Sequence, residues 1–248
     1  MHQFFVEDSQ VGKENVTITG EDVRHIKNAL RMKPGETIRI SSRTGGNYFC
    51  KIAKIGEAFV QADIVSEDTK GTELPSKIYL FQALPKGDRM ETVIEKAVEL
   101  GVYEIIPVEM KYCVVRLDKK RAENKVKRYQ SIAISAAKQS KRSMIPHVRE
   151  VMNYWDAISY AGNLDVCIVP YENEAGMAGT AAVLEKIKPG RSIGIIIGPE
   201  GGFAEEEIAA VRDTMDVISL GKRILRTDTA AITAMSLVML ALERAADE

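Results

Sequence analysis

Two glycine-bearing loops hold most of the residues in this chain whose types and spacing could support chemistry. The first reads Gly-Pro-Glu-Gly-Gly-Phe from Gly198 to Phe203, after the apolar run Ile195–Ile197, and the second runs from Gly221 to Thr229, after Ile218–Leu220. Ligands of open α/β sheets bind beyond the carboxyl ends of strands, where glycine lets backbone N–H and C=O groups approach closely. The two loops therefore predict a ligand-binding site.

The acidic residues near the first loop indicate the charge of that ligand. Glu200 lies in the turn, and Glu205, Glu206 and Glu207 open the following helix. These carboxylates offset the positive end of the helix dipole, so a phosphate would meet like charge whereas a cation would not. The chain also lacks GxGxxG and GxxxxGK[ST], so it gives no support for dinucleotide or P-loop chemistry. The structural alternative is a plain tight turn followed by a solvated helix start.

Composition excludes several other classes of site and protein. The 3 cysteines and 3 histidines are scattered, with no CxxC pair, so we expect no metal site. The apolar run at the N-terminus is too short for a signal peptide. The longest apolar stretch, Ala230–Leu242, is shorter than the roughly 20 residues of a membrane span. We therefore expect a cytoplasmic protein with reduced thiols and no membrane segment.

Residues 1–72 are typical of a small β-rich domain. Short runs with largely alternating polarity predict five strands, and a helix is expected after Thr19 and Gly20, where apolar residues recur at helical spacing. The economical interpretation is a small β-barrel with one helix, followed by a polar linker at Ser66–Glu73. The predicted strands are Phe4–Val6, Val16–Ile18, Thr37–Ile40, Tyr48–Ile52 and Phe59–Val65.

Residues 73–248 have a different pattern, in which apolar strands alternate with helices. Such alternation predicts an α/β domain with a parallel sheet that is covered on both faces. The predicted strands are Ile78–Phe81, Ile105–Val108, Val166–Val169, Ile193–Ile197 and Val217–Leu220. The predicted helices are Met90–Leu100, Arg121–Lys141, Ala178–Lys188, Ala204–Met215 and Thr229–Ala245.

Further motifs accompany the two loops in a fixed order. They are Leu-Arg-Met-Lys-Pro-Gly at 30–35, Leu-Pro-Lys-Gly-Asp at 84–88, Glu-Leu-Gly-Val at 99–102, and Ala-Ala-Lys-Gln-Ser-Lys-Arg at 136–142. Together, over nearly the whole chain, they resemble the ribosomal RNA small subunit methyltransferase E family of the SPOUT superfamily. The resemblance implies a PUA-like β-barrel ahead of a SPOUT-like α/β domain with a deep trefoil knot. It also implies a homodimer that uses S-adenosyl-L-methionine (SAM) to methylate N3 of a uridine in 16S rRNA.

The resemblance further implies which residues hold the cofactor in the knot. A sulfonium cation suits an acidic, glycine-bearing loop better than a phosphate does. Backbone of both loops would surround the cofactor, Leu225 would pack on the adenine, and the ends of two strands would complete the wall. The cofactor-binding residues implied are Val169, Ile197, Gly198, Gly201, Gly202, Leu220, Gly221 and Leu225.

Methylation at N3 requires the uracil ring to lose a proton. A nearby guanidinium would stabilise the negative charge that develops on the ring oxygens. Arg223 and Arg226 flank the second loop and are the candidate catalytic residues, with a phosphate contact or a surface ion pair as the alternative; no general base is evident. The chain departs from the family pattern at Tyr112-Cys113, where Arg-Ser is usual, and at Asp228, where Glu is usual.

The net charge of −1 conceals an uneven distribution. Lys111–Arg149 carries 12 Lys and Arg against 2 acids, whereas residues 150–248 carry 8 against 16. An unbalanced basic run favours contact with RNA phosphates, although a solvated helix face is the alternative. The candidate RNA-binding residues are Arg31, Lys33, Arg116, Lys138, Gln139 and Arg142.

The helix expected from Thr229 is apolar nearly all round. Because such a helix needs cover on both sides, we expect it to be buried between two subunits. Two other functions stay open: a methyltransferase of another RNA site, and a non-catalytic RNA-binding or ribosome-assembly factor. The intact glycines of both loops favour the enzyme.

Overall fold

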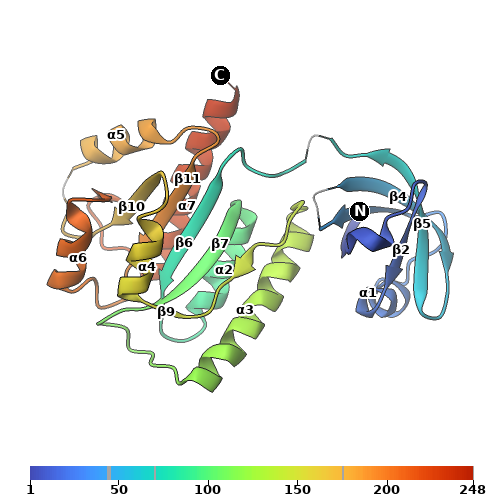
Figure 1. The fold of residues 1–248 in the computed structure, drawn as a ribbon, viewed down its shortest axis with the longest axis horizontal. Helices are drawn as coiled ribbons and strands as arrows, with labels where there is room; N and C mark the ends of the chain where they lie inside the picture. Colours follow the sequence, from blue (N-terminus) through green and yellow to red (C-terminus); the bar gives the residue numbers. More distant parts are fainter. Residues whose placement is uncertain (44–45, 70, 175, 248) are drawn as a thin grey trace. The chain divides into compact units, whose positions relative to one another are not determined.

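The computed structural model describes residues 1–43, 46–69, 71–174 and 176–247, which form two compact units (Figure 1). The first unit comprises Met1–Glu73 and Ala137–Ile145, and the second comprises Leu74–Ala136 and Pro146–Glu248. The division into domains 1–72 and 73–248 stays a prediction. The compact units differ from it mainly in the segment Ala137–Ile145, which packs with the N-terminal residues.

The first unit is built on a five-stranded sheet in the order β1-β3-β4-β5-β2. β1 and β3 are parallel, and the other pairs are antiparallel. Alternate residues such as Ile38, Ile40, Cys50 and Ile52 point into one apolar core, which explains the alternating sequence pattern. The elements are β1 (His2–Val6), η1 (Asp8–Gln10), β2 (Asn15–Thr19), α1 (Glu21–Arg24), a π-helical turn (His25–Ala29), β3 (Thr37–Ser42), β4 (Asn47–Ile55) and β5 (Phe59–Glu67).

Hydrogen bonds from buried polar side chains attach Ala137–Ile145 to this unit. The Arg39 guanidinium is buried, pairs with Asp68 at 2.7 Å and donates to the carbonyl of Lys141. The Gln3 amide donates to the carbonyl of Arg142. These bonds satisfy carbonyl groups just beyond a helix end, where intrahelical partners are missing.

The linker predicted at Ser66–Glu73 was wrong at both ends. β5 continues to Glu67, and the Glu73 carboxylate forms an ion pair with Arg142 and accepts the backbone N–H of Ser143 at 2.7 Å. Lys70 lies outside the described residues. Polarity alone suggested a linker because Arg142, the partner of the Glu73 carboxylate, is 69 positions away in the sequence.

The second unit contains a seven-stranded sheet in which every pairing is parallel. Its order is β12-β10-β11-β6-β7-β8, with β9 also paired to β7. The predicted parallel sheet is confirmed, whereas the trefoil knot stays a prediction. The strands are β6 (Lys77–Ala83), β7 (Val102–Glu109), β8 (His147–Val148), β9 (Met152–Asn153), β10 (Val166–Pro170), β11 (Ser192–Ile197) and β12 (Asp216–Ile218).

Helices cover both faces of this sheet, as the apolar strands require. α2 and α7 pack together and against β7 and β11. α4 and α6 contribute Tyr154 and Val211 to a second core, which includes Phe81 and Val108 of the sheet (Figure 1). The helices are α2 (Arg89–Glu99), α3 (Lys119–Gln139), α4 (Tyr154–Ala161), α5 (Ala178–Lys186), α6 (Glu205–Arg212) and α7 (Thr227–Asp247).

α7 buries only one of its faces within the chain. Ala231, Ala234, Met235 and Val238 are at most 1% exposed, whereas Leu240 is 60% exposed. By length and composition alone this helix could cross a membrane, but its buried face packs against α2, α5 and β11. The exposed side of α7 is thus left without the cover that its apolar sequence requires.

Candidate functional site

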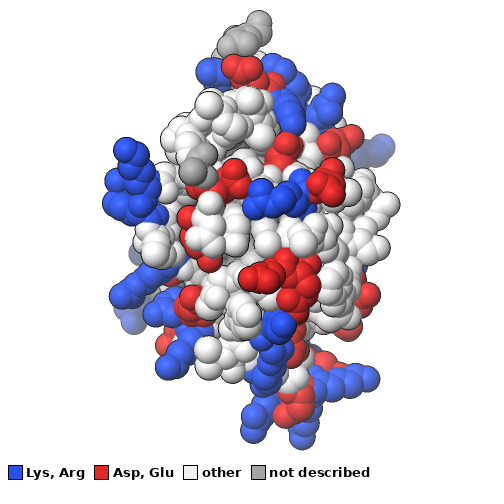
Figure 2. Space-filling model, turned by 90° about the vertical axis from the view of Figure 1, so that its left-hand side faces the viewer, with Lys and Arg blue, Asp and Glu red and all other residues white. Residues whose placement is uncertain are grey.

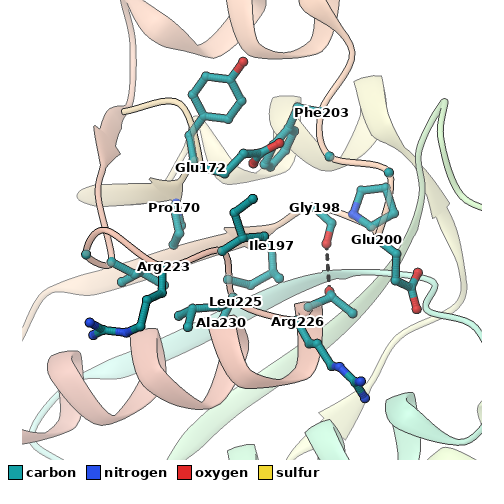
Figure 3. Close-up of a pocket in the computed structure, with 18 residues that line it drawn as sticks. Pro170, Glu172, Ile197, Gly198, Glu200, Phe203, Arg223, Leu225, Arg226 and Ala230 are labelled. Atoms are coloured by element: carbon teal, nitrogen blue, oxygen red, sulfur yellow. Dashed lines mark hydrogen bonds between the residues drawn. The ribbon is translucent and has the colours of Figure 1, made fainter. Parts of the chain in front are cut away.

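A cavity of about 420 Å³ opens where three neighbouring strands of the second unit end. Pro170 ends β10 and is followed by Tyr171 and Glu172, Ile197 ends β11 and is followed by the loop to Phe203, and the loop with Leu220 and Thr227 follows β12. Ala230 of α7 completes the lining (Figure 3). The two glycine-bearing loops of the sequence therefore lie together at the carboxyl edge of a parallel sheet, the usual ligand-binding position in such folds.

The structure brings most of the predicted site residues together around this cavity. Val169 is the exception, because it lies in the core of the sheet and only the following Pro170 begins the lining. The roles of all these residues in binding stay predictions. Lining the cavity are Ile197, Gly198, Gly201, Gly202, Leu220, Gly221, Leu225, Arg223 and Arg226.

Several lining residues were missed by the sequence reasoning. Tyr171 and Glu172 follow β10, and Phe203 ends the first loop. The rule that ligands bind beyond strand ends, applied to β10 as well as to β11 and β12, points to the first two. Phe203 packs edge-on against Tyr171, with ring centroids 6.2 Å apart.

Two glycines of the first loop have a structural reason, close packing at Gly201 and a positive φ at Gly202. At Gly201, a Cβ atom would lie 2.8 Å from the Cβ of Tyr112. At Gly202, φ is +73° and a Cβ would collide with a carboxylate oxygen of Glu172. Because side chains are excluded at both positions, the loop presents its backbone directly to the cavity.

Glu200 is already neutralised within the protein. Its Oε1 accepts the backbone N–H of Lys86 at 3.0 Å and pairs with Nη1 of Arg89 at 2.5 Å. Burial alone would raise the pKa of Glu200, but the hydrogen bonds from Lys86 and Arg89 hold this pKa below its ordinary value. Glu200 therefore offers the cavity less free negative charge than its position in the loop predicts, because its charge binds the loop to the start of α2.

Two of the three acids that open α6, Glu206 and Glu207, are also engaged. The buried carboxylate of Glu207 accepts the backbone N–H groups of Lys111 at 2.8 Å and Ala204 at 2.9 Å. Glu206 pairs with Nζ of Lys111 at 2.5 Å, an interaction that lowers the pKa of Glu206 and raises that of Lys111. These carboxylates hold the turn containing Tyr112 against the first loop rather than repelling anions from the cavity.

The charges left to the cavity are therefore few. The Glu172 side chain has no hydrogen bond or ion pair with any described residue, and the same holds for the side chains of Arg223 and Arg226. In Figure 3 the two guanidinium groups extend in opposite directions on the α7 side of the cavity. The Glu172 carboxylate lies across from them, beside Phe203.

A buried hydrogen-bond chain joins the second loop to the first. Nε2 of Gln82 donates to Oγ1 of Thr227 at 2.9 Å, and this hydroxyl donates to the carbonyl of Gly198 at 2.7 Å (Figure 3). Thr227 is 5% exposed, so water cannot readily replace either partner. These two hydrogen bonds hold the second loop close to the first at the base of the cavity.

Thr227→Val keeps the side-chain shape and removes this hydroxyl. We expect the free energy of unfolding, measured by urea denaturation, to fall by about 1–3 kcal/mol, because the partly buried Gly198 carbonyl loses its partner. Thr229→Val is the matched control, because Thr229 lies on the exposed side of the same helix turn. Equal unfolding midpoints for the two variants would show that the Thr227 hydroxyl contributes nothing to the stability of the fold.

The basic segment Lys111–Arg149 offers less free charge than its composition indicates. Of its 12 Lys and Arg residues, 7 form ion pairs in the structure. The segment is also divided, since Ala137–Ile145 belongs to the first unit. On the face shown in Figure 2, basic and acidic side chains are interspersed between wide uncharged areas. Local net charge therefore overstates the positive surface available.

The six candidate RNA-binding residues differ in availability. In the first unit, Lys138 pairs with Asp22 at 2.7 Å, while Arg142 is 3% exposed and bound to Glu73. Arg142 thus supports the structure of its own unit and is not presented to a ligand. Arg116, in the second unit, is exposed although it pairs with Glu109. The remaining three, Arg31, Lys33 and Gln139, are exposed in the first unit.

Comparison with known proteins shows which families this chain resembles. Residues 72–239 match an RNA methyltransferase domain, and residues 18–65 match an RNA methyltransferase PUA domain. The ribosomal RNA small subunit methyltransferase E of Bacillus subtilis is 34% identical over 245 residues, which cover 96% of each chain.

Solved structures agree over nearly the same length. A ribosomal RNA small subunit methyltransferase E from Neisseria gonorrhoeae, bound to SAM, has 33% identity and a TM-score of 0.81, covering 95% of this chain and 96% of that one. A putative methyltransferase from Legionella pneumophila, also with SAM, has 30% identity and a TM-score of 0.82, covering 96% and 97%. This chain belongs to the ribosomal RNA small subunit methyltransferase E family.

Proposed function

We propose that this protein uses SAM to methylate N3 of a uridine in 16S rRNA, within the small ribosomal subunit. The observation that carries the proposal is the cavity at the ends of β10, β11 and β12, in a chain related to rRNA methyltransferases along nearly its whole length. SAM supplies an electrophilic methyl group on a sulfonium centre.

The residues present fit such a cofactor. The cavity volume of about 420 Å³ lies within the usual range for small-molecule sites. Apolar side chains, among them Ile197, Leu220 and Leu225, offer a surface for the adenine, and glycine backbone lies close by. The unpaired Glu172 carboxylate suits a cationic ligand, whereas Glu200, Glu206 and Glu207 are paired within the protein.

Arg223 and Arg226 are the catalytic residues of this proposal. A uridine that gives up its N3 proton gains negative charge on its ring oxygens, and a guanidinium close to those oxygens stabilises this charge. Both side chains line the cavity and neither is held by another described residue. They are thus free to engage a base placed at the cavity mouth, while alignment of donor and acceptor supplies much of the remaining rate enhancement.

RNA contacts in this proposal extend beyond the six candidate residues. Lys119, Lys120 and Lys127 on α3 are exposed, and the structure gives none of them an ion pair. Lysines of this kind bind phosphates without sequence preference and in a salt-dependent manner. Arg31, Lys33, Arg116, Lys138 and Gln139 remain in the proposal, whereas the burial of Arg142 argues for a structural role.

The assembly and location of the protein are part of the same proposal. The exposed apolar side of α7, which includes Leu240, is the surface we assign to a homodimer. Cytoplasmic location follows from a ribosomal RNA substrate. Among the described residues, no group of three or more His, Cys, Asp or Glu is placed to hold a metal ion.

Mass analysis of nucleosides from 16S rRNA, made with and without this protein, tests the proposed function. We expect one 3-methyluridine to disappear when the protein is absent and to return when purified protein and SAM are added to small subunits. A changed nucleoside at another position would indicate a different RNA target. No change, together with no SAM binding in calorimetry, would indicate a non-catalytic RNA-binding or assembly factor.

A further inference from the structure

Two carboxylates line the cavity, and only one of them is free. Glu200 is bound by Arg89 and by the Lys86 backbone, whereas Glu172 has no partner among the described residues. We propose that Glu172 makes the cavity distinguish SAM from its demethylated product, S-adenosylhomocysteine. This inference rests on the proposed use of SAM.

These two ligands differ strongly in one property, the charge at the sulfur atom. SAM carries a positive sulfonium, while the product carries a neutral thioether in its place. The adenine, ribose and amino-acid groups are common to both, so their contacts cancel when the two affinities are divided. A fixed negative charge in the wall attracts the sulfonium and leaves the thioether unaffected.

The surroundings of Glu172 favour this electrostatic role. Its carboxylate lies against Gly202, close enough that an added Cβ would meet it, which places the charge at the cavity wall. In Figure 3 the carboxylate lies beside the ring of Phe203, which itself packs against Tyr171. Apolar rings and a ligand that displaces water lower the local dielectric and strengthen the interaction.

The other charges of the cavity do not substitute for Glu172. Arg223 and Arg226 lie across the cavity in Figure 3 and would oppose a cation. Glu200 is compensated by Arg89. Loss of the positive charge on methyl transfer would therefore remove an attraction at Glu172 and speed the exchange of product for fresh SAM.

Calorimetric titration of the full chain with SAM and with S-adenosylhomocysteine tests the proposal. The measured quantity is the Kd of the product divided by the Kd of SAM. In Glu172→Gln we expect this ratio to fall by about 3- to 10-fold. This range lies between the loss expected on removing an exposed ion pair and the loss expected on removing a partly desolvated one. The Kd of the product should change by less than about twofold, because its sulfur is neutral.

Glu174→Gln is the matched control, because Glu174 pairs with Arg212 and does not line the cavity. A third ligand, in which a protonated amine replaces the sulfonium, should respond to Glu172→Gln as SAM does. In the unaltered protein, the ratio should also decrease as salt rises, since ions screen an accessible charge. This salt titration needs no variant and is independent of any folding defect.

Three results would overturn the inference. Equal weakening of both ligands would mean that Glu172 contacts a group they share. An unchanged ratio, in the variant and across the salt range, would mean that the carboxylate does not sense the sulfur. If neither ligand binds the unaltered protein, the proposed function is refuted, and the inference with it.

Discussion

Arg226→Ala is expected to lower kcat for rRNA methylation by about 10²- to 10³-fold at saturating SAM and RNA. Removal of one group that stabilises developing negative charge typically has an effect of this size. Arg226 lines the cavity beside Thr227, whose hydroxyl fixes the position of this part of the loop. Steady-state methylation of small subunits, with labelled methyl transfer as the readout, measures kcat and KM, and a single-turnover experiment separates methyl transfer from product release.

Two neighbours of Arg226 serve as comparisons. Lys222→Ala removes a positive charge from the same loop at a position that does not line the cavity, so its kcat should stay within about twofold of normal. The kcat of Arg223→Ala, compared with that of Arg226→Ala, shows how much each guanidinium group contributes to catalysis. Near-normal turnover by Arg226→Ala at saturating RNA would remove Arg226 from catalysis, and a raised KM alone would assign it to RNA binding.

Residue patterns predicted the core elements because local periodicity determines them. The helix predicted at Met90–Leu100 occupies Arg89–Glu99, and the predicted terminator Gly101 has a φ of +90°. The apolar run Ile193–Ile197 forms the central strand β11, which is buried on both faces. In these elements, the residues that form the apolar pattern are also the residues that are buried in the fold.

Shorter elements escaped prediction because they carry too little pattern. β8 and β9 have two residues each and pair with β7 only because the chain passes alongside it. α4 did have a local signal, since Asn153 accepts the backbone N–H of Asp156 at 3.0 Å as an N-terminal cap. Three buried residues at helical spacing follow: Tyr154, Ala157 and Ala161.

The electrostatics of the site could not be obtained from local sequence. Glu200 and its partner Arg89 are separated by 111 positions, and Glu207 and the backbone N–H of Lys111 by 96. Counts of acids near a loop include such carboxylates although tertiary contacts neutralise them. Glu172 was overlooked for the converse reason, because only the folded structure shows that it faces the cavity without a partner.

Gly202→Ala is expected to weaken SAM binding by at least about tenfold. The residue adopts a φ of +73°, which costs an alanine about 1–2 kcal/mol, and the new methyl group would displace the Glu172 carboxylate from the cavity wall. The Glu172 side chain can move away from the new methyl group, but the strain of the positive φ can be relieved only by moving the backbone of the first loop, which lines the binding site. Calorimetric titration with SAM gives the change in Kd, and urea denaturation of the same samples gives the change in stability.

Gly190→Ala separates backbone strain from the shape of the cavity. Gly190 has a similar φ of +84°, belongs to the same unit and has no atom within 4 Å of an added Cβ. Both variants should therefore lose about 1–2 kcal/mol of unfolding free energy, while only Gly202→Ala should lose affinity for SAM. If Gly190→Ala weakened SAM binding as much as Gly202→Ala does, general destabilisation would explain both, and close approach at Gly202 would have no special role in the site.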